Sequence, residues 1–157
     1  MNLILWWSLF ILPWFLLLFF DKQRIKRFFP VLLLSIVLNS VVYQLAQKLN
    51  WFTISKNLPF LTNISPSVYG MFAVGTLLIF YFTYEKFWLY FIVNLLFDIL
   101  QSFVVTPFYG KLHLFKRQEM NGFESVLIMT VMSLIMYSYQ KWQDSVMIKN
   151  DKNNNKA

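Results

Sequence analysis

The chain has 157 residues, of which 58% are hydrophobic and 20% aromatic, whereas only 13% are charged. A soluble globular domain carries about 25% charged residues, and a chain of this length cannot bury so much apolar surface in its own core. The net charge of +7 comes from short basic clusters between apolar runs, the pattern of topology signals beside membrane helices. The composition therefore predicts an integral membrane protein whose main partner is the lipid bilayer. It argues against nucleic-acid binding, and the lack of cysteine excludes disulfides and thiolate catalysis.

Five apolar segments approach the roughly 20 helical residues that a bilayer core about 30 Å thick requires. They lie at about 2–20, 28–47, 68–84, 87–106 and 123–140, which predicts an all-α polytopic helical bundle over residues 1–148. No basic residue precedes the first segment and no small-residue cleavage site follows it, so we expect it to be retained as a helix. We expect residues 21–27 to form a charged loop and residues 149–157, KNDKNNNKA, to form a disordered polar tail.

Prolines and tryptophans give further expectations about the ends of these helices. Pro30 is expected in the first turn of the second span, and Pro107 is expected to end the fourth. The connection 48–67 keeps several apolar side chains and is expected to lie in the membrane interface. Interfacial tryptophans are expected at both ends: Trp6, Trp7 and Trp51 at one end, Trp88 and Trp142 at the other.

The distribution of Lys and Arg predicts the orientation of the bundle. With the N-terminus outside, the inner segments hold nine basic residues and the outer segments five. Four of the nine lie within 21–27, directly behind the first helix. The positive-inside rule therefore predicts an external N-terminus and a cytoplasmic C-terminus.

Asp98 is the most informative single residue, because it lies near the middle of the fourth span. A carboxylate there costs about 2.5–3.5 kcal/mol on insertion scales, so it needs a partner, a water-lined cavity or a proton. Polar residues at helical spacing predict a seam through the bundle. Its candidate residues are Tyr90, Asn94, Asp98 and Gln101 on the fourth span, Ser35, Asn39, Tyr43 and Gln47 on the second, and Thr130, Ser133 and Tyr137 on the fifth, with Glu124 near its outer end.

The seam has two interpretations. In the preferred one, its side chains hydrogen-bond across helices and fix the packing of a non-enzymatic structural or accessory protein, which acts through helix contacts with itself or another membrane protein. In the alternative, the seam lines a binding or transport site for a small solute, a proton or a cation, with Asp98 at its centre. A filled interior around Asp98 favours the first hypothesis, and a cavity that reaches it favours the second.

The sequence contains none of the common catalytic or nucleotide-binding motifs, so we expect no catalytic residue and no cofactor. His113 is the sole histidine and lies in a basic loop without ligands at metal-binding spacing, so no metal site is expected. Gly70, Ala73 and Gly75 are interpreted as small residues that allow close helix packing.

Several strings, distributed over nearly the whole chain, resemble a group of uncharacterised small multi-pass membrane proteins of spore-forming Gram-positive bacteria. They are Trp6-Trp7, LFILPW (9–14), IKRFFP (25–30), TNIS (62–65), Tyr69-Gly70, VGTLLIF (74–80), FWLYFIVNLLFD (87–98) and YQKWQ (139–143). The resemblance implies a bacterial cytoplasmic membrane. It implies no activity and no residue roles.

Overall fold

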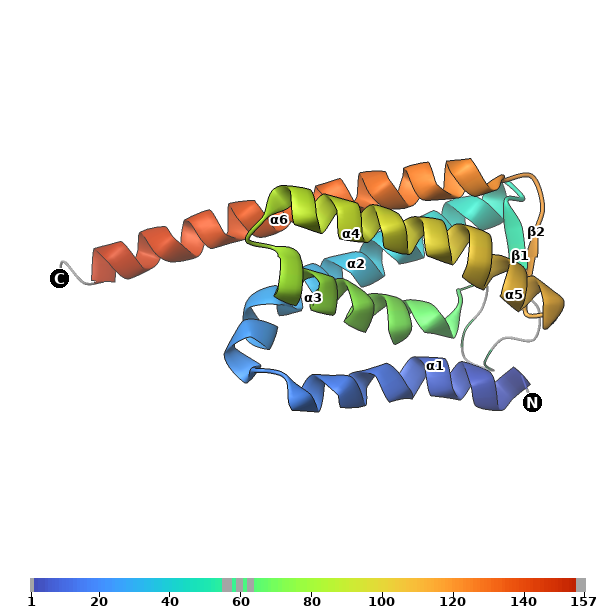
Figure 1. Ribbon diagram of the computed structural model, residues 1–157, viewed down its shortest axis with the longest axis horizontal. Helices are drawn as coiled ribbons and strands as arrows, with labels where there is room; N and C mark the ends of the chain where they lie inside the picture. The colour runs from blue at the N-terminus through green and yellow to red at the C-terminus, as the bar shows by residue number, and fades with distance from the viewer. Residues whose placement is uncertain (1, 55–57, 59–60, 62–63, 155–157) are drawn as a thin grey trace.

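The computed structural model describes residues 2–54, 58, 61 and 64–154, with the side chains of 4–54, 58, 61 and 64–146. It is an all-α helical bundle with one small pair of strands (Figure 1). Along the chain follow α1 (Asn2–Leu16), the 3-10 turn η1 (Leu17–Phe19), α2 (Lys22–Lys48), β1 (Phe52–Ile54), the 3-10 turn η2 (Pro66–Val68), α3 (Met71–Thr83), α4 (Phe87–Leu100), the π-helical turn η3 (Gln101–Val105), α5 (Thr106–Lys111), β2 (Phe115–Arg117) and α6 (Gly122–Asn154).

The long helices run alternately between two ends of the molecule (Figure 1). We call the end where α1 and α6 begin and β1 pairs with β2 the strand end. We call the opposite end, where α2 begins and α3 ends, the arginine end, because Arg24 and Arg27 lie there.

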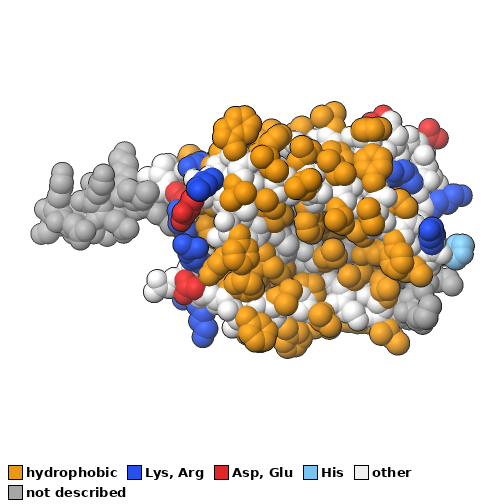
Figure 2. Space-filling model, in the orientation of Figure 1, with side chains coloured by type: hydrophobic (Ala, Val, Ile, Leu, Met, Phe, Trp, Pro, Cys, Tyr) orange, Lys and Arg blue, Asp and Glu red, His pale blue; other side chains and the backbone are white. Residues whose placement is uncertain are grey.

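Four helical segments are long and apolar enough to cross a membrane within the described part of the chain. They are Lys22–Lys48, Pro66–Thr83, Phe87–Lys111 and Gly122–Val146, and the helix over Ile4–Phe19 is a shorter apolar one. Hydrophobic side chains cover the middle of the face seen in Figure 2, and Lys and Arg side chains gather at both ends. This distribution is that of a membrane-embedded bundle, with an apolar belt between two charged ends.

Residues 22–27 of the charged segment are helical, so the prediction of a loop there was wrong. Asp21 is the N-cap of α2, and its side chain accepts a hydrogen bond from the backbone N–H of Arg24 at 3.1 Å. This cap satisfies an orphan donor of the first turn and lets the helix begin six residues earlier than hydropathy indicates. Pro30 consequently lies inside α2 and not in its first turn.

The fourth span continues past Pro107, which was expected to end it. The π-helical turn η3 widens the backbone before the proline, and the Thr106 hydroxyl donates to the Gln101 carbonyl at 2.9 Å. Pro107 lies near the start of α5, where its missing N–H costs little. The widened turn leaves Gln101 and Ser102 buried on the inner face of the helix.

The predicted disordered tail is helical through Asn154, because α6 extends without interruption from Gly122. The tail contains neither proline nor glycine to stop hydrogen bonding from the preceding turns. Residues 155–157 lie outside the described part of the chain.

The connection 48–67 and the loop after α5 meet at the strand end. Their strands are antiparallel, with Phe52 opposite Arg117, and the rings of Phe52 and Phe115 lie 4.8 Å apart. A small hydrophobic cluster packs beneath them, in which Trp6 is 1% exposed and its ring contacts Tyr109. The prediction that Trp6 faces the interface was therefore wrong, whereas Trp7 is exposed.

The main core lies between α2, α3, α4 and α6 toward the arginine end, and aromatic rings dominate it. Its buried members are Phe28, Val31, Leu32, Ala73, Leu77, Phe80, Tyr84, Tyr90, Met136 and Tyr137. α1 contacts this bundle closely at Gly70, where an added Cβ would lie 2.1 Å from the Leu9 carbonyl oxygen. Gly75 has nothing within 4 Å of the equivalent position, so its interpretation as a close-packing residue was wrong.

Candidate functional site

Five of the predicted seam residues surround one interior cavity. Asn39 from α2 and Asn94, Asp98 and Gln101 from α4 and its π turn line a cavity of about 60 Å³, which we call the Asp98 cavity. Ser133 of α6 lines it as well. The other walls are apolar or weakly polar, from Phe72, Thr76, Ile79, Phe97, Met129, Met132 and Met136. The interior beside Asp98 is thus hollow.

A second cavity of about 70 Å³ adjoins it toward the strand end, and we call it the strand-end cavity. Tyr43, Ser65, Ser67 and Arg117 contribute polar groups to its wall. The two cavities share Asn39, Phe72, Gln101, Met129 and Met132 as lining residues. A buried water needs roughly 10–15 Å³ and two or more polar partners, so each cavity has room for a few waters. The polar residues on their walls form a series from Asp98 toward the strand end, which we call the polar path.

The Asp98 carboxylate has little compensation for its charge. It is half-buried, and Oδ2 accepts a hydrogen bond from the Thr130 hydroxyl at a long 3.4 Å. The ion pairs found in the described part of the chain are Arg24–Glu85 and Arg27–Asp144, and neither includes Asp98. An ionised carboxylate in an apolar interior is costly unless a counter-charge or water stabilises it. Asp98 thus requires a proton, a cation or water from the adjoining cavity.

The side-chain amides beside Asp98 differ in their hydrogen bonding. The Asn94 side-chain N–H donates to the Tyr90 carbonyl at 2.9 Å, and that of Asn39 donates to the Ser35 carbonyl at 2.8 Å. Gln101 Oε1 is buried and has no hydrogen-bond partner among the described residues. Buried polar atoms are normally paired, so an orphaned oxygen beside a cavity marks a place for a donor or a cation.

Other predicted seam residues serve packing. The Tyr90 hydroxyl donates to the Ser133 carbonyl at 2.8 Å, while its ring packs against Phe80 and Tyr137. The Tyr137 hydroxyl donates to the Tyr84 carbonyl at 3.4 Å. These bonds join α4 and α6 to each other and to the end of α3, and neither tyrosine lines the cavity.

Residues at the ends of the predicted polar faces also lie outside the seam. Glu124 and Asn121 form a capping box, in which each side chain accepts from the other's backbone N–H at 2.8 and 2.9 Å. Gln47 is exposed. Ser35 is buried, and its hydroxyl donates to the Leu32 carbonyl of its own helix at 2.7 Å.

Arg117 is a site residue that the sequence did not indicate. Its Nη2 donates to the Ser102 carbonyl oxygen at 3.1 Å and lies 3.2 Å from the Ser102 hydroxyl. Burial lowers the pKa of its guanidinium. Strand β2 places this arginine on the wall of the strand-end cavity. Only the strand pairing positions it there, and a three-residue strand between helices gives no detectable periodicity.

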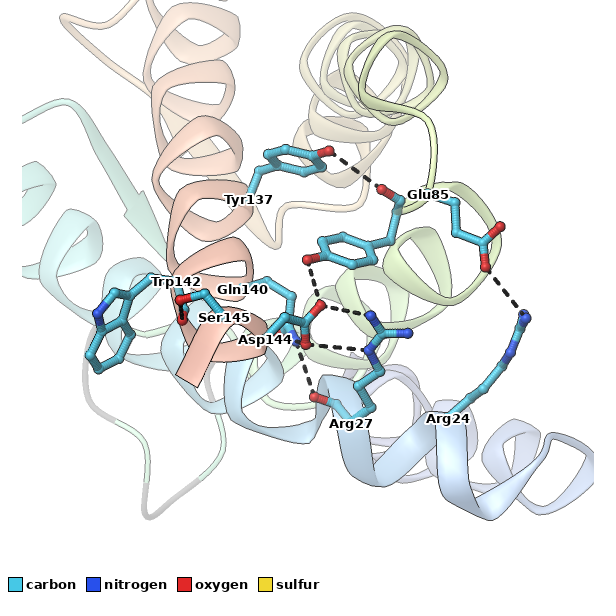
Figure 3. A network of polar contacts seen from close by, with 9 residues as sticks. Arg24, Arg27, Glu85, Tyr137, Gln140, Trp142, Asp144 and Ser145 are labelled. Carbon is cyan, nitrogen blue, oxygen red and sulfur yellow. Dashed lines mark hydrogen bonds and ion pairs between the residues drawn. The ribbon is translucent and has the colours of Figure 1, made fainter. Parts of the chain in front are cut away.

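A polar network closes the opposite end of the bundle (Figure 3). The Asp144 carboxylate accepts hydrogen bonds from the Arg27 guanidinium, the Tyr84 hydroxyl and the Gln140 side-chain amide. The groups come from α2, α3 and α6, so the network ties three helices together at the arginine end. Its residues do not line the Asp98 cavity.

The described residues contain no group of three or more His, Cys, Asp and Glu side chains placed to hold a metal ion. His113 is exposed at the strand end. In comparisons with protein-family models, with curated proteins and with solved structures, nothing matches the chain.

Proposed function

We propose that the protein is a non-enzymatic membrane component that binds or transports a small polar solute or a proton, with Asp98 as the ionisable centre. The observation that carries this proposal is the cavity of about 60 Å³ beside Asp98, together with the lack of a described basic partner for the carboxylate. An intramembrane carboxylate next to a polar cavity is the usual arrangement of a proton or solute path.

The proposed setting is a bacterial cytoplasmic membrane, with the N-terminus outside and the C-terminus in the cytoplasm. The charged ends, the apolar belt and the excess of basic residues at the arginine end support this orientation. The polar path from Asp98 then leads toward the external side.

Cysteine labelling tests whether water reaches the site. Because the chain has no cysteine, Gln101→Cys introduces a single thiol in the cavity, and Leu96→Cys is the matched control on the exposed apolar face of the same helix. A small charged thiol reagent modifies only a hydrated thiolate, so we expect Gln101→Cys to react at least about ten-fold faster than Leu96→Cys. Equal, slow labelling of both would contradict the proposal.

A structural or accessory role through helix contacts is the second candidate, and a groove favours it. Ser40 and Gln44 lie in an open groove of about 900 Å³ along α2, beside Tyr69. The groove is wide enough for a partner side-chain ridge, and amides promote helix association in membranes. If this candidate holds, Gln44→Leu reduces copurification of a partner or a second copy, while Asp98→Asn leaves activity intact.

A further inference from the structure

We propose that the Asp98 cavity binds a monovalent metal cation of the alkali type, such as sodium. The inference rests on the proposed function and names the ligand class of the same site. It narrows the cation alternative of the sequence analysis to an alkali ion, and it concerns a different place from His113, where no metal site is expected.

The first support is the chemistry of the groups that remain free to bind. Asn39 and Asn94 each use one side-chain N–H on a backbone carbonyl of their own helix. A donor must face each carbonyl, which fixes the orientation of both amides, and each residue lines the cavity and has an amide oxygen as an acceptor. Gln101 adds a buried oxygen without a partner, and Asp98 adds a carboxylate. Carboxylate and amide oxygens are the ligands of hard cations.

The second support is the count of charges. Asp98 is the sole charged side chain among the described residues that line the cavity. One carboxylate neutralises one positive charge, whereas calcium and magnesium sites generally combine several charged or water ligands. Neutral amide oxygens complete the coordination of a monovalent ion without adding charge to an apolar interior. The balance therefore favours an alkali cation over a divalent one.

The third support is the location of Arg117. Its guanidinium lies on the wall of the strand-end cavity, which makes that cavity unfavourable for a cation. The Asp98 cavity is not lined by Arg117. We therefore expect the cation at Asp98 alone. The strand-end cavity is expected to hold water or an uncharged part of the solute.

The methionines make the site adaptable. Met129, Met132 and Met136 line the Asp98 cavity from α6, at spacings that place them on one face. Methionine side chains are flexible and fill irregular space, so they can move to let amide oxygens approach an ion. They supply no charge of their own.

A proton competes with the cation for Asp98. No other described residue that lines the Asp98 cavity from α2, α3 or α6 titrates. The titratable groups around it include Tyr90, two turns away on α4, Tyr137 packed against Tyr90, and Tyr43 and Arg117 on the wall of the adjoining strand-end cavity. Cation binding requires the ionised carboxylate, so the apparent affinity is expected to fall as the pH is lowered.

The experiment is a thermal unfolding series of the purified full chain in lipid nanodiscs. Sodium chloride replaces choline chloride at constant ionic strength, and lithium and potassium chloride form parallel series. A ligand that binds only the folded state raises the melting temperature with concentration, so we expect a saturable rise with at least one alkali ion. Asp98→Asn is expected to abolish the rise, and Gln101→Met to shift its midpoint at least about ten-fold to higher concentration, equivalent to 1.4 kcal/mol. Glu119→Gln removes an exposed carboxylate and is expected to retain the full response.

The outcomes separate this inference from the proposed function. A melting temperature that responds equally to alkali and choline salts, or an unchanged response in Asp98→Asn, would overturn the cation site. If Asp98→Asn does not fold, the rise in melting temperature with sodium is measured in the unsubstituted protein at several pH values. A rise that does not weaken at low pH contradicts a cation site at Asp98. Labelling of Gln101→Cys can be measured in choline chloride without any alkali ion, so the proposed function stands or fails on its own.

Discussion

The Arg27 guanidinium holds the Asp144 carboxylate through two hydrogen bonds, 2.7 Å from Nη2 to Oδ2 and 3.3 Å from Nε to Oδ1. The pair joins the first turns of α2 to the C-terminal half of α6. Tyr84 donates a further hydrogen bond of 2.6 Å from the end of α3. The network therefore joins the helices at the arginine end, while the Asp98 cavity and the strand-end cavity lie between the middle and the strand end.

Arg27→Met should destabilise the bundle by roughly 1–3 kcal/mol, because it leaves the buried Asp144 carboxylate without its charged partner. The Asp144 side chain is 12% exposed, but Arg27 is 45% exposed, so solvent screening keeps the loss below that of a fully buried pair. The measurement is unfolding of the purified protein in mixed micelles.

Arg24→Met is the matched control for this change. Arg24 lies 3.7 Å from Glu85, and both side chains are largely exposed, so its loss should cost no more than about 1 kcal/mol. Equal losses for the two variants would show that the Asp144 network does not stabilise the fold.

Gly70→Ala should separate α1 from the bundle. The added Cβ would lie 2.1 and 2.5 Å from the carbonyl oxygens of Leu9 and Phe10, and backbone atoms cannot move aside independently. We expect a loss of about 1–3 kcal/mol from overpacking, measured as a lower melting temperature. Gly75→Ala has open space around it and should be neutral or stabilising by up to about 1 kcal/mol. Similar melting temperatures for both variants would contradict the close contact at Gly70.

Hydropathy and helical periodicity predict the helical bundle and the inward polar faces, because lipid imposes both. These patterns fail where a single local interaction determines the structure against the mean hydropathy of the segment. Asp21 extends α2 by capping it, and the π turn before Pro107 keeps the fourth span helical. Arg117 reaches the cavity only through long-range strand pairing, and Asp144 lies among polar residues that resemble a solvated tail. The amide orientations that define the Asp98 cavity depend on hydrogen bonds that spacing alone does not specify.

Single cysteines should also report the orientation of the bundle. Lys116→Cys lies at the strand end and Lys141→Cys toward the arginine end, and both positions are exposed. With the N-terminus outside, a membrane-impermeant thiol reagent should label Lys116→Cys in intact cells and Lys141→Cys only after permeabilisation. The reverse pattern would place the N-terminus in the cytoplasm and reverse the direction of the polar path.

Changes at Asp98 separate the two functional hypotheses. Asp98→Asn keeps the shape of the side chain and its contact with Thr130, so it should fold as the parent does. An amide neither releases a proton nor neutralises a cation, so the variant should lose activity if Asp98 is the binding centre. Asp98→Leu removes the desolvation cost but leaves the Thr130 hydroxyl and the cavity amides facing an apolar group, with a loss of about 1–3 kcal/mol.

The measurement for both variants combines unfolding in detergent with complementation of a strain that lacks the gene, scored by growth or solute uptake. A folded but inactive Asp98→Asn would contradict the purely structural interpretation. Full complementation by Asp98→Asn would end the proton and cation hypotheses together, because the neutral amide preserves packing and abolishes charge. The stability of Asp98→Leu then shows how much of the packing depends on the polar seam. If the seam is structural, the variants that lose stability are the ones that lose complementation. If Asp98 is a binding site, Asp98→Asn loses activity while its stability stays that of the parent.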